Sequence, residues 1–191
     1  AGCPGLEADV LEASVRYRDG LLASGVVRAF HLDRGAVTGP YDAVTLLHVL
    51  ELVPDPAAFL ADLAPVLRDG GFMWVQVPNA AVATNDLLVF DHCSHFTAGA
   101  LADVVARSGL VLAGLEASAG GRELSAQIRR AGGPVAPATA GSEMHLPRAL
   151  DELGRFRDAV RGADRDPWVF GVGNMGAWIA AERDGRLAGY V

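Results

Sequence analysis

The hydrophobic pattern of residues 41–79 predicts a strand, a helix and a second strand. Apolar residues dominate Ala43–Leu47 and Phe72–Val77, and each run has the length of a buried strand. The residues between these runs carry apolar side chains at helical spacing. Because a strand, a crossover helix and a second strand form the unit of a parallel sheet, the pattern indicates an α/β fold.

The predicted helix has signals at both ends. Asp55 is placed as its N-cap and Pro56 as its first residue, where the missing N–H of proline has no cost. Gly70 and Gly71 are expected to end it. The apolar residues between these ends are expected on one helical face: Phe59, Leu60, Leu63, Val66 and Leu67.

Further elements are predicted on both sides of this unit. Residues 5–9 are interpreted as a strand end that runs into a helix with an apolar side reaching residue 22. Val26–Leu32 is the next predicted strand. Downstream, Thr97 is expected to cap a helix that Gly109 stops.

The rest of the chain predicts a closing hairpin and a second unit. Leu110–Leu115 and Glu123–Arg129 are interpreted as antiparallel closing strands. A small, Pro- and Gly-rich stretch follows, and Pro147 then opens a helix. Trp168–Phe170 and Leu187–Val191 are predicted strands around one more helix. The expected organisation is a first domain over residues 1–131, a linker over 132–146 and the start of a second domain over 147–191.

Composition and charge exclude several classes of function. The formal net charge is −7 and the chain holds no lysine, so we expect no nucleic-acid partner, no Schiff-base lysine and no Walker-type phosphate loop. No apolar run is long enough to span a membrane and no leader precedes the first domain, which predicts a cytoplasmic protein without a membrane partner. Cys3 and Cys93 are interpreted as thiols.

Two motifs carry a resemblance to a known family. Residues 41–79 read YDAVTLLHVLEL…VPN, and residues 91–96 read DHCSHF. The chain resembles class I S-adenosylmethionine-dependent methyltransferases that carry a C-terminal Rossmann-like extension, such as sugar C-methyltransferases. The resemblance implies a Rossmann-like, doubly wound, mostly parallel sheet with an antiparallel closing hairpin, followed by a partial second βαβ unit. It also implies S-adenosylmethionine as cofactor and a small-molecule acceptor.

The resemblance assigns three cofactor-binding residues. Glu7 is interpreted as ending the first strand, where a carboxylate accepts both ribose hydroxyls; otherwise it is a helix N-terminal acid. Asp33 resembles the acid that meets the adenine amino group, or it is a turn former. His48 follows a strand at the place where the family holds a residue under the sulfonium, or it serves in packing. We expect these three side chains to converge on one crevice.

The resemblance also assigns the catalytic residues. Asp91, His92 and His95 lie in the DHCSHF run, and Asp91 and His92 align with the acid and histidine of the family's YHEH-type run. A histidine beside an acid can remove the acceptor's proton near neutral pH. The alternative is a helix-entry loop with hydrogen-bonded histidines. We expect no metal, because ligands this close in sequence seldom converge without a second cluster elsewhere.

A glycine motif leaves a second function open. Gly171, Gly173 and Gly176 follow a predicted strand and open a helix, as in nucleotide-binding turns. The alternatives to methyl transfer are therefore an NAD(P)-binding oxidoreductase and a non-catalytic nucleotide-binding module. The glycine-rich cofactor turn of the methyltransferase family should precede Glu7. Either it lies in a longer parent chain, which we favour, or this protein has lost it. The acceptor, the methylated atom and the oligomeric state stay open.

Overall fold

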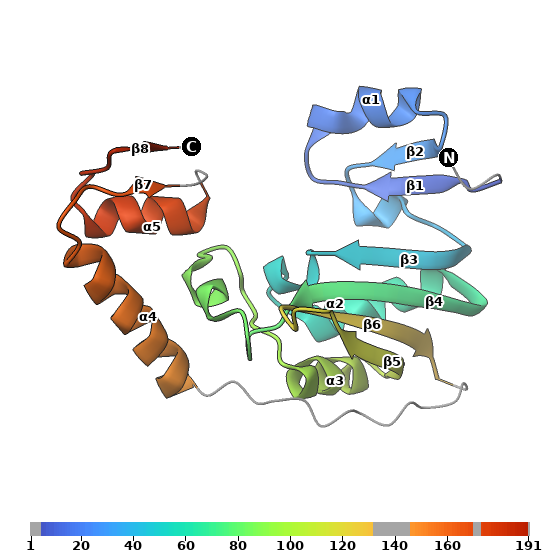
Figure 1. Ribbon diagram of the computed structural model, residues 1–191. Helices are drawn as coiled ribbons and strands as arrows, with labels where there is room; N and C mark the ends of the chain where they lie inside the picture. Colours follow the sequence, from blue (N-terminus) through green and yellow to red (C-terminus); the bar gives the residue numbers. More distant parts are fainter. Residues whose placement is uncertain (1–4, 132–145, 170–172, 191) are drawn as a thin grey trace.

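The computed structural model describes residues 5–131, 146–169 and 173–190 (Figure 1). Its strands are β1 (Ala8–Leu11), β2 (Val27–His31), β3 (Tyr41–Leu47), β4 (Leu67–Pro78), β5 (Leu110–Ala117), β6 (Glu123–Arg130), β7 (Trp168–Val169) and β8 (Gly189–Tyr190). Its α-helices are α1 (Arg18–Ala23), α2 (Pro56–Leu63), α3 (Ala98–Arg107), α4 (Leu146–Arg161) and α5 (Asn174–Glu182). Short 3₁₀ helices are η1 (Val15–Tyr17), η2 (Arg34–Ala36), η3 (Leu50–Leu52), η4 (Ala64–Val66) and η5 (Thr84–Leu88).

The strands form an α/β arrangement, as the sequence predicts. β1 and β2 pair in parallel. A four-stranded sheet has the order β3-β4-β6-β5, in which β3 and β4 are parallel and β6 is antiparallel to both of its neighbours. The parallel pair and the antiparallel closing hairpin are therefore confirmed.

The hydrophobic core lies between one face of the four-stranded sheet and the helices α2 and α3. Alternate residues of β4, Met73, Val75 and Val77, are fully buried there, as expected for a strand with one face in a core. Leu60 of α2 and Leu101 of α3 pack against them and are also fully buried. The core therefore fixes β4, whose carboxyl end leads into the candidate site.

The predicted helix caps are confirmed, but one helix end was placed wrongly. The Asp55 carboxylate accepts a hydrogen bond from the Ala58 N–H, and Pro56 is the first residue of α2. Helix α2 ends at Leu63, not at Gly70-Gly71. Pro65 follows, and because it has no N–H for the helical ladder, the chain turns through η4 and enters β4 at Leu67.

The first strand was also placed wrongly. β1 begins at Ala8, so Glu7 precedes the strand and does not end it. Val10 and Leu11 belong to β1 and not to a helix, because the ladder with β2 holds this segment extended. The helical turns begin only after Ser14, whose hydroxyl accepts a hydrogen bond from the Arg16 N–H.

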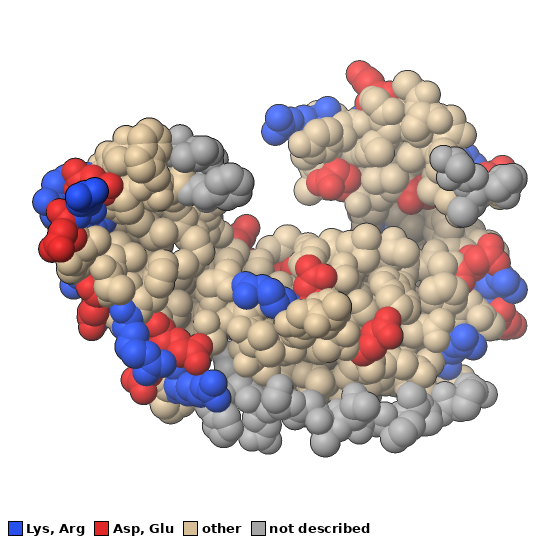
Figure 2. Space-filling model, viewed as in Figure 1, with Lys and Arg blue, Asp and Glu red and all other residues tan. Residues whose placement is uncertain are grey.

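A cavity of about 400 Å³ separates the β1–β2 pair from the four-stranded sheet and lies between β1 and β3. Within the described residues no ladder joins these two strands. In Figure 2 the part that contains β1, β2 and α1 stands apart from the body, with an opening between them. β3 was predicted to be buried, but within the described residues it pairs with β4 alone: Leu46 is buried, whereas Leu47 is 54 % exposed.

Beside this cavity, Asp9 joins the β1–β2 pair to the four-stranded sheet through a hydrogen bond. The Tyr41 hydroxyl of β3 donates a hydrogen bond of 2.6 Å to Asp9 of β1, and Arg28 of β2 donates two more to the same carboxylate. The hydrogen bonds from Arg28 and Tyr41 lower the pKa of Asp9 from 3.8 to about 2. Burial and the same carboxylate raise the pKa of Tyr41. A charged Asp9 therefore stabilises the approach of β1 to β3.

The C-terminal residues form a separate small unit. β7 and β8 pair in parallel around α5, as the sequence predicts for a βαβ unit. Phe156 of α4 stacks on Trp178 of α5, and both helices contact η5. The predicted linker lies almost entirely outside the described residues, so the domain boundaries stay a prediction. No helix in the described ranges is long and apolar enough to cross a membrane.

We expect the variant Asp9→Asn to be less stable than the wild type by about 1 kcal/mol at neutral pH, because it loses charge-assisted hydrogen bonds to partly exposed partners. The native pKa of Asp9 is depressed, so this stabilisation is present above 3.8 and is lost as the pH falls towards about 2. Urea denaturation over a pH series should show the two proteins converging in acid. Asp19→Asn, which changes an exposed acid of α1, is the control. A stability gap that does not change with pH would contradict the assignment.

Candidate active site

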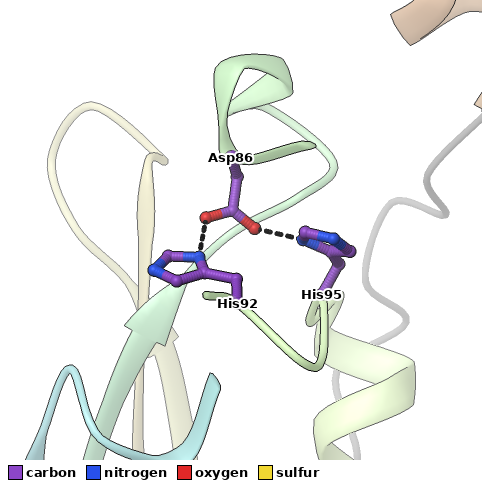
Figure 3. Close-up of side chains that lie close together, drawn as sticks. All are labelled: Asp86, His92 and His95. Atoms are coloured by element: carbon purple, nitrogen blue, oxygen red, sulfur yellow. Dashed lines mark hydrogen bonds and ion pairs between the residues drawn. The ribbon is translucent and has the colours of Figure 1, made fainter. Parts of the chain in front are cut away.

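The main polar cluster consists of Asp86, His92 and His95 (Figure 3). The Asp86 carboxylate is 4 % exposed, and its two oxygens contact different imidazoles. Oδ1 lies 2.7 Å from His92 Nδ1, and Oδ2 lies 2.6 Å from His95 Nδ1. One buried carboxylate thus orients both histidine rings, whose centroids are 6.4 Å apart.

Asn79 holds the backbone that presents this cluster. It follows β4 directly and is buried. Its side-chain amide donates a hydrogen bond of 2.7 Å to the Gly121 carbonyl, and its backbone carbonyl oxygen accepts from the N–H groups of Val82 and Ala83. The Ala80 N–H donates to the Phe96 carbonyl. These bonds fold the segment from residue 79 to residue 96 back onto itself, so that η5 and the histidines meet.

An ionised Asp86 selects one tautomer of each neutral imidazole in the cluster. An ionised carboxylate only accepts hydrogen bonds, so each imidazole must donate its Nδ1–H to Asp86. In a neutral imidazole the proton is then on Nδ1 and the lone pair is on Nε2. The arrangement therefore presents two Nε2 atoms that can act as bases.

Asp91 was predicted as the acid beside His92, but the carboxylate in contact with that ring belongs to another residue, so a catalytic role of Asp91 stays a prediction. Asp91 is exposed in a turn, and the acid that contacts His92 is Asp86 of η5. Adjacent side chains in a turn diverge, whereas a residue six positions earlier returns to the histidines through η5. No sequence motif signalled Asp86, because its approach depends on the Asn79 hydrogen bonds.

His48 forms a second polar cluster at the end of β3. Its Nδ1 lies 3.1 Å from Oε1 of Glu51, which is 1 % exposed, and its Nε2 lies 3.4 Å from Glu123. Its backbone has a φ of 54°, in the left-handed region that residues with a Cβ adopt at a cost. Such strain is concentrated at functional sites, which agrees with the predicted position of His48 beside the ligand.

The two clusters are connected through the backbone of Glu51. The N–H groups of Cys93 and Ser94 both donate to the Glu51 carbonyl, at 2.7 and 3.1 Å. The segment that contains His92 and His95 is therefore attached to the loop that follows His48. The structure brings these three predicted histidines into one region at the carboxyl ends of β3 and β4.

The acid that follows β1 is Glu12 and not Glu7, which the sequence had predicted. Glu12 directly follows β1, and its carboxylate contacts the Ser14 N–H at 3.1 Å. Asp33 follows β2 as expected and caps η2 through the Gly35 N–H. Glu7 lines the cavity between β1 and β3, but Asp33 and His48 are not among its lining residues, so the three do not converge there. Glu12 could have been found from the serine cap two residues later, which marks the end of the strand.

The glycine motif is described only in part. Gly171 lies outside the described residues. Gly173 is the N-cap of α5, and a Cβ built on it would have no neighbour within 4 Å. Gly176 is buried in the first turn of α5. The open space at Gly173 agrees with a role in ligand approach, which stays a prediction.

Comparison with known proteins gives a consistent family. A family model described as a methyltransferase domain matches residues 8–114, more than half of the chain. A curated relative, the ubiquinone biosynthesis O-methyltransferase of Marinobacter nauticus, is 49 % identical over 41 residues. That match covers 22 % of this chain and 17 % of the relative.

Solved structures share the fold at low sequence identity. The mitomycin 7-O-methyltransferase superposes with a TM-score of 0.55 at 21 % identity, covering 67 % of this chain and 43 % of that protein. The 8-amino-8-demethyl-D-riboflavin dimethyltransferase of Streptomyces davawensis gives a TM-score of 0.55 at 19 % identity, covering 66 % of this chain and 43 % of that protein. An O-methyltransferase of neocarzinostatin biosynthesis, solved with S-adenosylmethionine and 2-hydroxy-5-methyl naphthoic acid, gives 0.53 at 18 %, covering 65 % and 42 %. The chain thus spans less than half of each of these proteins.

The shared carboxylate makes a testable prediction about tautomers. In the wild type, the neutral forms of His92 and His95 should both carry their proton on Nδ1. Asparagine offers one acceptor and one donor, so in Asp86→Asn only one ring can donate and the other must move its proton to Nε2. Long-range ¹H–¹⁵N spectra of histidine-labelled protein measure this, with the His48 signals as internal control. A wild-type His92 or His95 with its proton on Nε2 would contradict the geometry.

Proposed function

Because the chain belongs to the methyltransferase domain family, we propose that it transfers a methyl group from S-adenosylmethionine to a small acceptor molecule. The cofactor supplies an electrophilic methyl group on a sulfonium. The observation that carries the chemical part of the proposal is the buried Asp86 carboxylate, which holds two imidazoles beside the carboxyl end of β4. A cytoplasmic location, expected from the sequence, stays a prediction.

The acids that follow β1 and β2 fit the nucleoside part of the cofactor. In parallel sheets, ligands bind beyond the carboxyl ends of the strands. The Glu12 side chain is exposed and its only described contact is the Ser14 N–H, so it keeps acceptor capacity for two ribose hydroxyls. Asp33 is proposed to accept from the adenine amino group. His48 is proposed to lie beside the sulfonium.

The histidine pair is proposed to remove the acceptor's proton. As the acceptor's O, N or C atom forms its bond to the methyl carbon, the carbon–sulfur bond breaks and the sulfur becomes a neutral thioether. The acceptor's proton passes to Nε2 of His92 or His95, which then carries a positive charge. Asp86 stabilises that charge through the Nδ1–H hydrogen bond. Base assistance of this kind contributes about 10²–10⁴ to a rate.

One observation favours a second candidate function. β7, α5 and β8 form a parallel βαβ unit with Gly173 at the N-terminus of α5, an arrangement that suits the phosphates of a dinucleotide. Binding of NAD(P) through Gly171, Gly173 and Gly176 is therefore the alternative. Calorimetry with NADH, run beside S-adenosylhomocysteine, separates the two functions.

We expect Glu12→Gln, made in the full-length parent protein, to weaken S-adenosylhomocysteine binding by about tenfold or more, because a charged acceptor of two hydroxyls is lost. Titration calorimetry measures the affinity. Glu7→Gln is the matched control, with the same chemical change five residues earlier on an exposed side chain. If Glu7→Gln weakens binding and Glu12→Gln does not, the proposed placement is wrong.

We expect His92→Ala and His95→Ala to lower methyl transfer, by about 10² for the residue that serves as the base. Formation of S-adenosylhomocysteine is measured with a panel of hydroxylated aromatic acceptors, including the naphthoic acid held by the neocarzinostatin relative. Cofactor affinity should stay within about twofold of the wild type, since neither residue is assigned to cofactor binding. Asp91→Asn tests the same loop at an exposed carboxylate; a loss in this variant equal to that of His92→Ala would restore the sequence-based assignment.

A further inference from the structure

Three side chains of the described residues converge as metal ligands do. Asp86, His92 and His95 each offer one ligand atom, and these atoms all lie within 4.8 Å of one another. The sequence predicts no metal site, because the histidines have no second ligand-bearing element near them in the chain. The structure provides that element as η5, which carries Asp86.

We propose that Asp86, His92 and His95 form a binding site for a divalent transition-metal cation such as Zn²⁺. Imidazole nitrogen and carboxylate oxygen are ligands that suit Zn²⁺, Co²⁺ and Ni²⁺, and two histidines with one carboxylate are a known ligand set of zinc sites. A buried carboxylate also offers a cation a negative charge in a region of low dielectric constant.

The ligand atoms of the cluster lie near the spacing that a zinc ion requires. Ligand atoms bonded to zinc at about 2.0–2.1 Å stand about 3.3 Å apart in a tetrahedron. The two carboxylate-to-imidazole distances are 2.7 and 2.6 Å, shorter than this spacing, and all three ligand atoms lie within 4.8 Å of one another, so the side chains must rotate to admit an ion. The side chains of His92 and His95 are 14 % and 27 % exposed, which leaves a side open to water as a fourth ligand.

The cation would take the place of the two Nδ1 protons. When Nδ1 of a neutral imidazole binds a metal, its proton is released and Nε2 takes up a proton, so that no net charge or electron is transferred. Nε2 then has no lone pair for the acceptor's proton. If the proposed methyl transfer is correct, on which this step alone rests, Zn²⁺ bound here inhibits the enzyme.

Titration calorimetry of the 191-residue chain with zinc chloride tests the site. We expect one bound ion per chain and an affinity that falls about tenfold or more in His95→Ala and in Asp86→Asn. His95 is partly exposed, so its truncation leaves the core intact, and Zn²⁺ should raise the melting temperature of the wild type and not of His95→Ala. The absence of binding, or equal affinity in these variants, overturns the proposal.

Cys93→Ser is the matched control, because Cys93 lies between the two histidines and carries an exposed thiol. Its affinity for Zn²⁺ should equal that of the wild type. Co²⁺ substitution gives an independent readout, since a thiolate ligand produces a charge-transfer band that histidine and carboxylate do not. A site that disappears in Cys93→Ser, or that shows this band, overturns the proposed ligand set.

Zn²⁺ binding and methyl transfer are measured separately, so the metal-site proposal and the proposed methyltransferase function can fail independently. Binding measured by calorimetry needs no turnover, so a chain that binds Zn²⁺ and transfers no methyl group keeps the metal site and loses the methyltransferase assignment. A chain that transfers methyl groups and binds no Zn²⁺ keeps the methyltransferase assignment and loses the metal site. In an active protein, Zn²⁺ should lower turnover of the wild type and of Cys93→Ser over the same concentration range.

Discussion

The hydrogen bonds of Asn79 are the contacts on which the candidate site depends. This one buried residue joins the end of β4, the turn between β5 and β6, and the backbone that leads into η5. Its side-chain amide donates to the Gly121 carbonyl, its backbone N–H donates to the Arg122 carbonyl, and its backbone carbonyl accepts from the two residues that precede η5. The core holds β4 in place. The hydrogen bonds of Asn79 therefore also fix the position of residues 79–96, a segment with little regular secondary structure.

Much of the fold follows from local sequence signals. Apolar runs predict β4 and the closing hairpin because burial on the core side imposes alternation, and Asp55 and Thr97 predict helix starts because their side chains accept the first backbone N–H groups. The predicted position of the first strand was wrong because the apolar run that marks it is short. β1 has four residues, and its pairing with β2 decides the boundary, so the strand-end acid was placed at Glu7 and not at Glu12.

The site was predicted less completely for a different reason. The histidines were visible in the DHCSHF run, since imidazoles beside a strand end are chemically distinctive. Asp86 was not, because a carboxylate in a polar stretch resembles any surface acid until the chain returns it to the histidines. Burial of Asp86 is compensated by two N–H donors, and this requirement explains why both rings face it. Local patterns identify the chemical groups, and tertiary contacts decide which of them act together.

The space between β1 and β3 has a mechanical consequence for the site. Among the described residues, the part that carries Glu12 and Asp33 contacts the remainder through few polar side chains: Asp9 with Tyr41, and Arg34 with Asp62. No ladder stiffens this junction. Within the described residues, side-chain contacts and not backbone hydrogen bonds therefore hold this part against the four-stranded sheet. The positions of Glu12 and Asp33 relative to the histidine pair thus depend on contacts that a single substitution at Asp9 or Tyr41 would remove.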